Sequence, residues 1–141
     1  MERFSIGDAC EILVGRGLAT TAESWRDLDG RRAVVVTQPG AADTARRVSA
    51  QMRCAAAVTT HMLPDGEPAK TLQSLQGVFA TCVDAGLGRG DLVVAVGGGT
   101  VSDVAGFAAA TYLRGVAWIA VPTTLLAAVD AAIGGKTGVN F

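Results

Sequence analysis

The sequence has little of what would suit a disulfide framework, a charged interface or a membrane span. Its 141 residues include one histidine and three cysteines. The cysteines, Cys10, Cys54 and Cys82, are odd in number and far apart, which is typical of reduced, buried thiols in a cytoplasmic protein. The twelve basic and thirteen acidic residues form no long run of one sign, so we expect no nucleic-acid or anionic-membrane surface.

Signals for membrane insertion and secretion are also missing. The longest uncharged segment, 115–129, contains Pro122 and is shorter than the roughly 20 residues of a membrane helix. The start, MERFSIGDAC, has no basic region followed by an apolar one, which a secretory signal would need. We therefore expect a cytoplasmic protein that binds a small molecule.

Half of the residues are hydrophobic, which is enough for one globular domain over residues 1–141. Short apolar runs alternate with segments of helical periodicity, and this order predicts an α/β fold, a Rossmann-like, doubly wound and mainly parallel sheet. A first strand is expected within 4–14, followed by a short polar helix through Trp25. The later strands are expected at 33–36, 55–62, 92–96 and 116–121, and the helices at 43–52, 71–86, 99–113 and 124–133.

Three glycines, Gly97, Gly98 and Gly99, follow the apolar run LVVAV. At the carboxyl end of a parallel strand, such a turn lets a phosphate approach free backbone N–H groups, and glycine permits close approach and unusual φ angles. This favours a dinucleotide site, although a tight turn without a ligand remains an alternative. Ser102 replaces the third glycine of the usual fingerprint, and no acidic residue follows at the usual ribose distance of about 20 residues.

Other polar residues flank the same strand ends. Asp103, expected in the first helical turn, suits ribose hydroxyls or a helix-start carboxylate, and Thr123 and Thr124 suit helix capping or a cofactor. Asp130 lies in the apolar stretch AAVDAAIG and is expected to need a partner, such as a structural salt bridge. Lys136 is a candidate anion ligand or a surface residue.

Three blocks, PDGEPAK, GGGTVSDVAGFAAATYLRG and VPTTLLAAVDAAIGGKTGVN, together resemble the 3-dehydroquinate synthase family over residues 64–140. The resemblance implies a homodimeric enzyme of the shikimate pathway that uses NAD. Its substrate would be 3-deoxy-D-arabino-heptulosonate 7-phosphate, which is oxidised, loses phosphate, is reduced again and closes to a carbocycle. Hydride transfer would belong to the cofactor.

The resemblance also implies roles for individual residues. Asp130, Lys136 and Asn140 would contact the substrate, and Arg114 would reach its phosphate across a dimer interface. Arg114 read by itself suits either a phosphate or the end of a helix. The implied NAD contacts are Asp65, Gly66, Glu67, Lys70, Gly97, Gly98, Gly99, Thr100, Val101, Ser102, Asp103, Thr123, Thr124 and Lys136.

The sequence departs from the family pattern in three respects. Ser102 stands where many members have glycine, which is expected only to tighten the start of the helix. Gln38 and Pro39 stand where an acidic ribose contact is common, so adenosine binding is expected to differ. Family members also carry a second, helical domain with a glutamate and two histidines that bind zinc or another divalent metal such as cobalt. The only histidine here is His61, and a catalytic zinc needs about three protein ligands. We therefore expect no metal site in this chain, which would be the N-terminal, NAD-binding part of the synthase and inactive alone.

Three alternatives stay open: another sugar-phosphate cyclase, an iron-type alcohol or glycerol dehydrogenase, and a non-catalytic NAD-binding module. The dehydrogenases would be expected to have a lysine near Gly106, where this sequence reads AGFAAATYLRG. Other cyclases usually interrupt the pair Gly134-Gly135 before Lys136, which is intact here.

Overall fold

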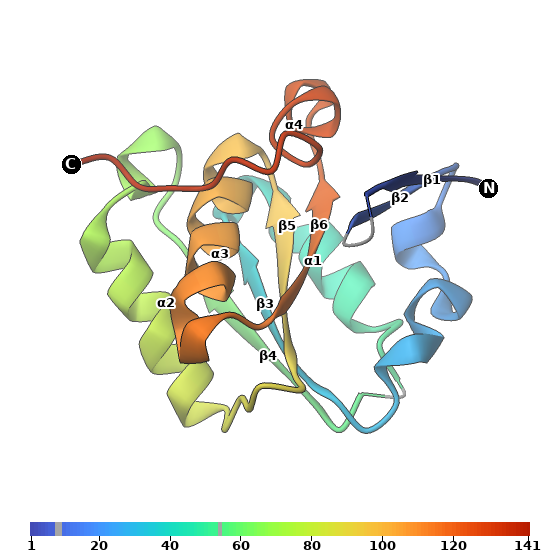
Figure 1. Cartoon of the computed structure of the whole chain (residues 1–141), viewed down its shortest axis with the longest axis horizontal. Coiled ribbons are helices and arrows are strands. Elements are labelled where there is room, and N and C mark those ends of the chain that lie inside the picture. Colours follow the sequence, from blue (N-terminus) through green and yellow to red (C-terminus); the bar gives the residue numbers. More distant parts are fainter. Residues whose placement is uncertain (8–9, 54) are drawn as a thin grey trace.

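A computed structural model describes residues 1–7, 10–53 and 55–141, and it confirms the α/β fold. Four parallel strands form the main sheet in the order β4-β3-β5-β6 (Figure 1). The strands are β3 (Arg32–Thr37), β4 (Ala57–Met62), β5 (Leu92–Gly97) and β6 (Ala117–Pro122). Every residue of the central strand β5 is buried, which explains its continuous apolar run, because helices cover both faces of a parallel sheet.

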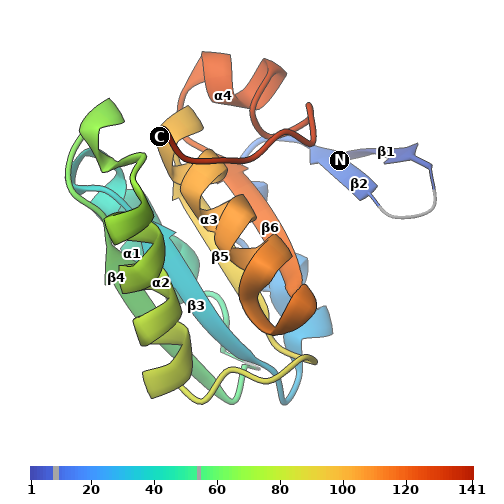
Figure 2. The same cartoon turned by 60° about the vertical axis from the view of Figure 1, so that its left-hand side comes forward.

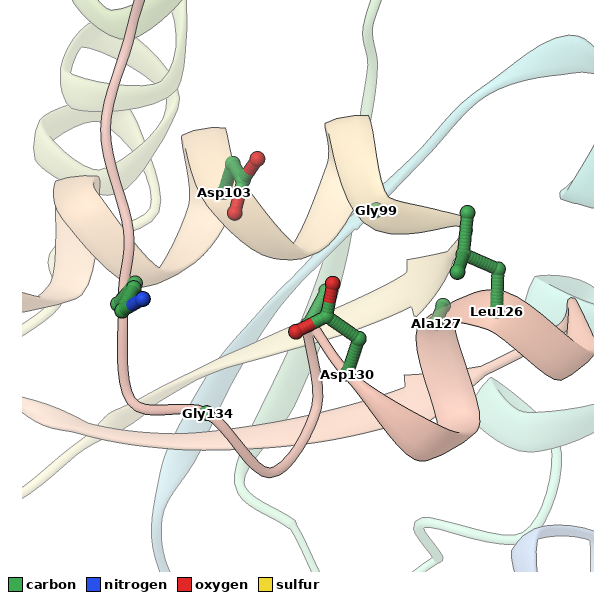
Figure 3. Close-up of a pocket in the computed structure, with 8 residues that line it drawn as sticks. Gly99, Asp103, Leu126, Ala127, Asp130 and Gly134 are labelled. Carbon is green, nitrogen blue, oxygen red and sulfur yellow. The ribbon is translucent and has the colours of Figure 1, made fainter.

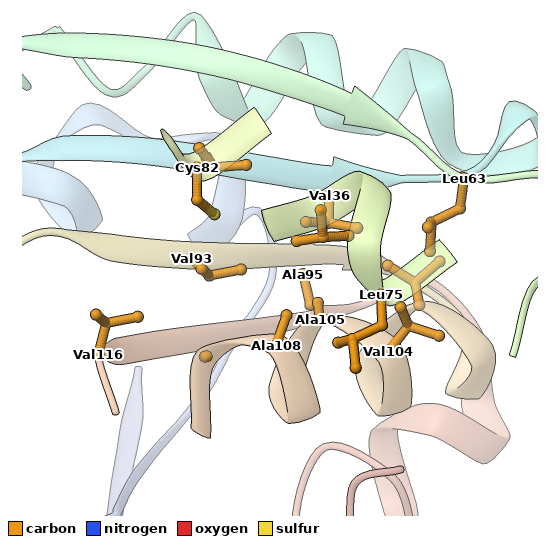
Figure 4. Close-up of a cluster of buried hydrophobic side chains, with 14 of the residues drawn as sticks. Val36, Leu63, Leu75, Cys82, Val93, Ala95, Val104, Ala105, Ala108 and Val116 are labelled. Carbon is orange, nitrogen blue, oxygen red and sulfur yellow. The ribbon is translucent and has the colours of Figure 1, made fainter. Parts of the chain in front are cut away.

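Helices pack on both faces of this sheet, as a doubly wound fold requires (Figure 2). α2 (Leu72–Asp84) and α3 (Gly99–Thr111) cover one face, where side chains such as Val36, Leu75 and Val104 interdigitate (Figure 4). α1 (Ala42–Ser49) and the 3₁₀ helix η2 (Ala22–Leu28), which carries the buried Trp25, cover the other. None of the helices in the described residues is long and apolar enough to cross a membrane.

The N-terminal region differs from the single strand predicted within 4–14. It forms an antiparallel hairpin of β1 (Glu2–Ile6) and β2 (Cys10–Val14), which is a sheet of its own. Gly7, which follows β1, has a φ of +59°, which suits glycine. Cys10 is exposed and Cys82 is buried, so the prediction of buried thiols is wrong for Cys10, and Cys54 lies outside the described residues.

The last helix, α4 (Leu125–Val129), is shorter than the predicted 124–133. Asp130 leaves the helical conformation with φ −130° and ψ −79°, and Gly135 turns the chain back with a φ of +65°. The following segment then crosses over α3. Gly106 makes this crossing possible, because a Cβ there would lie 2.4 Å from Cγ2 of Thr137.

The strand order predicts where a ligand would bind, beyond the carboxyl ends of the strands. The connection from β3 to β4 runs to one side, and β5 leads to β6 on the other. In open α/β sheets ligands bind beyond the carboxyl ends of the strands where the order reverses, which here is between β3 and β5. Gln38 and Gly98 follow these two strand ends.

Candidate functional site

The three glycines at the end of β5 and the start of α3 differ in what requires a glycine there. A Cβ on Gly97 would lie 2.4 Å from Cγ2 of Val101, so this glycine is required by packing. Cβ atoms on Gly98 and Gly99 would have no neighbour closer than 3.6 and 3.8 Å, respectively. None of the three has a positive φ, so the expected unusual backbone angles are wrong. At Gly98 and Gly99 a Cβ would make only ordinary van der Waals contacts, so packing does not require glycine at either position.

The amino end of α3 lacks a side-chain cap. Its N-cap residue is Gly98, and no acidic residue lies in the first turn, so the prediction that places Asp103 there is wrong. At the start of α4, by contrast, Oγ1 of Thr124 accepts a hydrogen bond from the Ala127 N–H at 3.1 Å, as capping predicts. The first N–H groups of α3 therefore remain available to an anion, which the helix dipole also favours.

A charged cluster forms where the β4–α2 loop meets α3. The Lys70 ammonium lies 2.7 Å from Oδ2 of Asp103 and 3.4 Å from Oε1 of Glu67. The Lys70 and Asp103 side chains are only 20% and 22% exposed. The hydrogen bond to Asp103 is the main cause of a raised pKa for Lys70. Two residues implied by the resemblance as cofactor contacts are thus in direct contact.

Glu67 is held by three side chains. The Asn140 Nδ2 donates to its Oε1 at 3.3 Å and the Thr100 hydroxyl donates to its Oε2 at 3.0 Å. These bonds, that of Asn140 first, lower the pKa of Glu67. The Asn140 N–H also donates to the Lys70 carbonyl at 2.9 Å, so Asn140 ties the C-terminal segment to this loop.

Two adjoining cavities lie beside the cluster, with volumes of about 300 and 210 Å³. Asp103 and Lys136 line both of them, and Asp130 lines the larger one. Figure 3 shows Asp103 on α3 and Asp130 after α4 on opposite sides of the larger cavity. Asp130 is exposed and pairs with no cation among the described residues. The alternative of a structural salt bridge is therefore wrong, and the carboxylate is free to face a ligand.

The remaining candidates are more scattered. Thr123 donates its N–H to the Gly97 carbonyl at 2.9 Å and lies at the strand end. Val101 is fully buried, and Ser102 is buried with a hydroxyl that has no hydrogen-bond partner among the described residues. Arg114 follows the far end of α3, about 20 Å of helix from the glycine turn, so this chain does not bring it to the other site residues.

Sequence reasoning missed the contribution of Gln38, whose buried amide donates to the carbonyls of Pro64 and Gly66. The β4–α2 loop carries the turn signature of Pro64, Asp65 and Gly66, but no local pattern indicates that its hydrogen-bond partner follows β3. No group of three or more His, Cys, Asp or Glu residues suited to a metal ion occurs within the described ranges.

Residues 60–141 match the family model of the 3-dehydroquinate synthase N-terminal region. Over 141 residues the chain is 42% identical to the 3-dehydroquinate synthase of Corynebacterium jeikeium (strain K411), covering 98% of this chain and 38% of that protein. The chain thus spans well under half the length of that relative.

Solved structures of related enzymes superpose on almost the whole chain. A 2-deoxy-scyllo-inosose synthase, complexed with carbaglucose-6-phosphate, NAD⁺ and Co²⁺, has a TM-score of 0.88 at 30% identity. The superposition covers 99% of this chain and 40% of the inosose synthase chain. The 2-epi-5-epi-valiolone synthase of Streptomyces hygroscopicus subsp. jinggangensis 5008, with NAD⁺ and Zn²⁺ bound, has a TM-score of 0.72 at 29% identity. The superposition covers 98% of this chain and 40% of the valiolone synthase chain.

Proposed function

The chain belongs to the 3-dehydroquinate synthase family, and from this premise we propose that it forms the NAD-binding domain of a 3-dehydroquinate synthase. The complete enzyme would act as a phosphate lyase of the shikimate pathway, converting 3-deoxy-D-arabino-heptulosonate 7-phosphate to 3-dehydroquinate and phosphate. The observation that carries the proposal is the Lys70–Asp103 pair, which lies beside a cavity of about 300 Å³ lined by Asp103, Asp130 and Lys136.

The residues present fit NAD. Gly98 and Gly99 have no side chain to keep a pyrophosphate from the backbone, Gly99 lines the larger cavity, and the uncapped first turn of α3 offers N–H donors. Glu67, Lys70 and Asp103 provide acceptors and a cation for ribose hydroxyls and the carboxamide. Bound NAD would supply the hydride acceptor and donor. Asp65, Gly66, Thr100, Val101, Ser102, Thr123 and Thr124 complete the proposed surroundings of the cofactor.

The substrate would bind in the adjoining cavity. Lys136 is exposed there and can pair with a carboxylate or phosphate. Asp130, across the cavity from α3 (Figure 3), can accept hydrogen bonds from sugar hydroxyls. Asn140 would act on the substrate only indirectly, because its amide holds Glu67. The chain's own residues therefore orient a sugar phosphate beside the cofactor.

The proposal extends to the complete enzyme. The two related cyclases were solved with Co²⁺ or Zn²⁺, and the described residues offer no donor set that fits such an ion. The ligands of such an ion would therefore come from a part of the enzyme outside residues 1–141. The chain alone would bind NAD without turnover. The complete enzyme would be a cytoplasmic homodimer, in which Arg114 of one copy reaches the site of the other.

A second candidate is another sugar-phosphate cyclase activity, because the superposed structures are an inosose synthase and a valiolone synthase. Phosphate release by the complete polypeptide separates the two. The synthase should release phosphate from the heptulosonate phosphate in the presence of NAD and zinc, but not from glucose 6-phosphate. The opposite preference would favour the second candidate. Absence of NAD binding by the chain would contradict both.

A further inference from the structure

We propose that Gln38 is a positioning residue for the β4–α2 loop, residues 63–70. Its hydrogen bonds would hold this loop where the Glu67 and Lys70 side chains contact α3. The inference rests on the proposed NAD-binding function for its consequence, but its structural part stands on hydrogen bonds within the chain. Gln38 follows β3 at the point where the sheet order reverses. It is only 9% exposed.

Both hydrogens of the Gln38 amide have backbone partners. Nε2 donates to the Pro64 carbonyl at 2.7 Å and to the Gly66 carbonyl at 3.0 Å. An ionised carboxylate cannot donate at all, and in this place it would face two carbonyl oxygens. The buried side chain therefore has to be a neutral donor, which explains why an acidic residue does not fit here.

Thr37, the residue before Gln38, is hydrogen-bonded on two sides. The Thr37 hydroxyl donates to the Val96 carbonyl at 2.8 Å, joining the ends of β3 and β5. The Leu63 N–H donates to the Thr37 carbonyl at 2.8 Å and fixes the start of the loop. Gln38 thus reaches the loop from a strand end that is hydrogen-bonded both to β5 and to the start of the loop.

The two carbonyls flank the turn that leads to the charged residues. Gly66 has φ +73° and ψ −168°, a conformation open essentially to glycine. The next residues form the 3₁₀ turn Glu67–Ala69, with Ala69 fully buried, and Lys70 follows. Since Gln38 holds the residues before this turn, it controls where the Glu67 and Lys70 side chains emerge.

The structure therefore assigns Gln38 a role different from that of an acidic ribose contact. Its two donors are committed to the loop, so its effect on the cofactor passes through Glu67 and Lys70. A direct contact with NAD is the competing explanation, and it predicts that the loop stays unchanged when the amide is lost.

The test compares Gln38→Met, which keeps the length without donors, and Gln38→Glu, which keeps the shape, with Gln76→Met on the exposed face of α2. Amide hydrogen exchange of residues 63–70 and the Kd for NAD are measured for each chain. Loss of both bonds should speed exchange at the Ala69 and Lys70 amides at least fivefold and raise the Kd about tenfold for the methionine variant. The glutamate variant should show a larger effect, and Gln76→Met none. Exchange within β3 and β5 should not change.

Unchanged loop exchange in both Gln38 variants would overturn the proposal, and so would faster exchange with an unchanged Kd. A raised Kd with unchanged exchange would instead make Gln38 a direct ligand. If Gln38→Glu does not fold, Gln38→Asn, one methylene too short for both carbonyls, takes its place. A wild-type chain that binds no NAD would overturn the proposed function, while the exchange data would still decide the position of the loop.

Discussion

The ammonium of Lys70 lies 2.7 Å from a carboxylate oxygen of Asp103 and joins the β4–α2 loop to the second turn of α3. Both side chains are mostly buried. The contact therefore couples the electrostatics of the site to the stability of the fold, and it leads to the first prediction.

The Lys70–Asp103 pair should contribute to stability at neutral pH and lose that contribution in alkali. Because the pKa of Lys70 is raised in the folded chain, the stabilisation is complete below the unfolded pKa of about 10.4. It disappears as the pH rises through the higher folded pKa. At pH 7 the pair is expected to contribute about 1 kcal/mol. A double-mutant cycle of Lys70→Met and Asp103→Asn, followed by urea unfolding from pH 7 to 11, measures it; a coupling that does not begin to fall between pH 10 and 11 would contradict the assignment.

The pKa of Glu67 should rise when Asn140 is replaced by alanine. The Asn140 amide is the first cause of the lowered Glu67 pKa, so the variant should titrate closer to the ordinary value. Stability linked to Glu67 is present above its unfolded pKa and lost as the pH falls through the lower folded one. NMR titration of the Glu67 carboxyl measures the change, with exposed Glu23 as the reference. An unchanged titration curve would show that the 3.3 Å contact is not formed in solution.

Alanine at Gly97 and at Gly98 should separate packing from ligand binding. Gly97→Ala places a Cβ 2.4 Å from Cγ2 of Val101, and such overpacking is expected to cost about 1–3 kcal/mol of unfolding free energy. Gly98→Ala meets only ordinary contacts, the nearest being 3.6 Å from Thr124. Because alanine is a poorer N-cap than glycine, this variant should cost less than about 1 kcal/mol of stability, and its Cβ should weaken NAD binding by hindering the approach of the pyrophosphate to the backbone. Thermal unfolding and calorimetry measure both effects, and equal destabilisation by the two variants would remove this evidence for a ligand.

Loss of the Lys136 charge should affect the substrate and not the fold. Lys136 is exposed and lines both cavities, so Lys136→Met is expected to raise the Kd for the heptulosonate phosphate about tenfold with little change in melting temperature. Arg47→Met is the matched control, because Arg47 is an exposed cation on the solvent side of α1. Its loss should have no effect on either measurement. Equal behaviour of the two variants would leave Lys136 an ordinary surface residue.

The sequence predicted the parts of the molecule that local patterns determine. The apolar runs at 33–36 and 92–96 became β3 and β5 because both faces of these strands are buried. The hairpin was missed because exposed side chains leave little alternation in 2–14. The helix predicted over 124–133 was too long because α4 ends where the chain turns back toward α3.

The site was predicted less completely than the fold. Residue types and the family resemblance identified Glu67, Lys70 and Asp103, but only the folded chain brings them together. Gln38 was singled out for the acidic residue that it replaces, and its two donor bonds to another loop depend on the sheet order. Contacts between segments distant in sequence are invisible to local periodicity.

The crossing of residues 136–140 over α3 sets an order of events during synthesis. All four strands of the sheet end by Pro122, so the sheet can pair while the site is still incomplete. The bonds from Gly138 to the Asp103 carbonyl and from Asn140 to the Lys70 carbonyl form only after the ribosome has released these later residues. Because domains fold as synthesis proceeds, a nascent chain stalled shortly after β6 would have the sheet and its helices but no ordered ligand site.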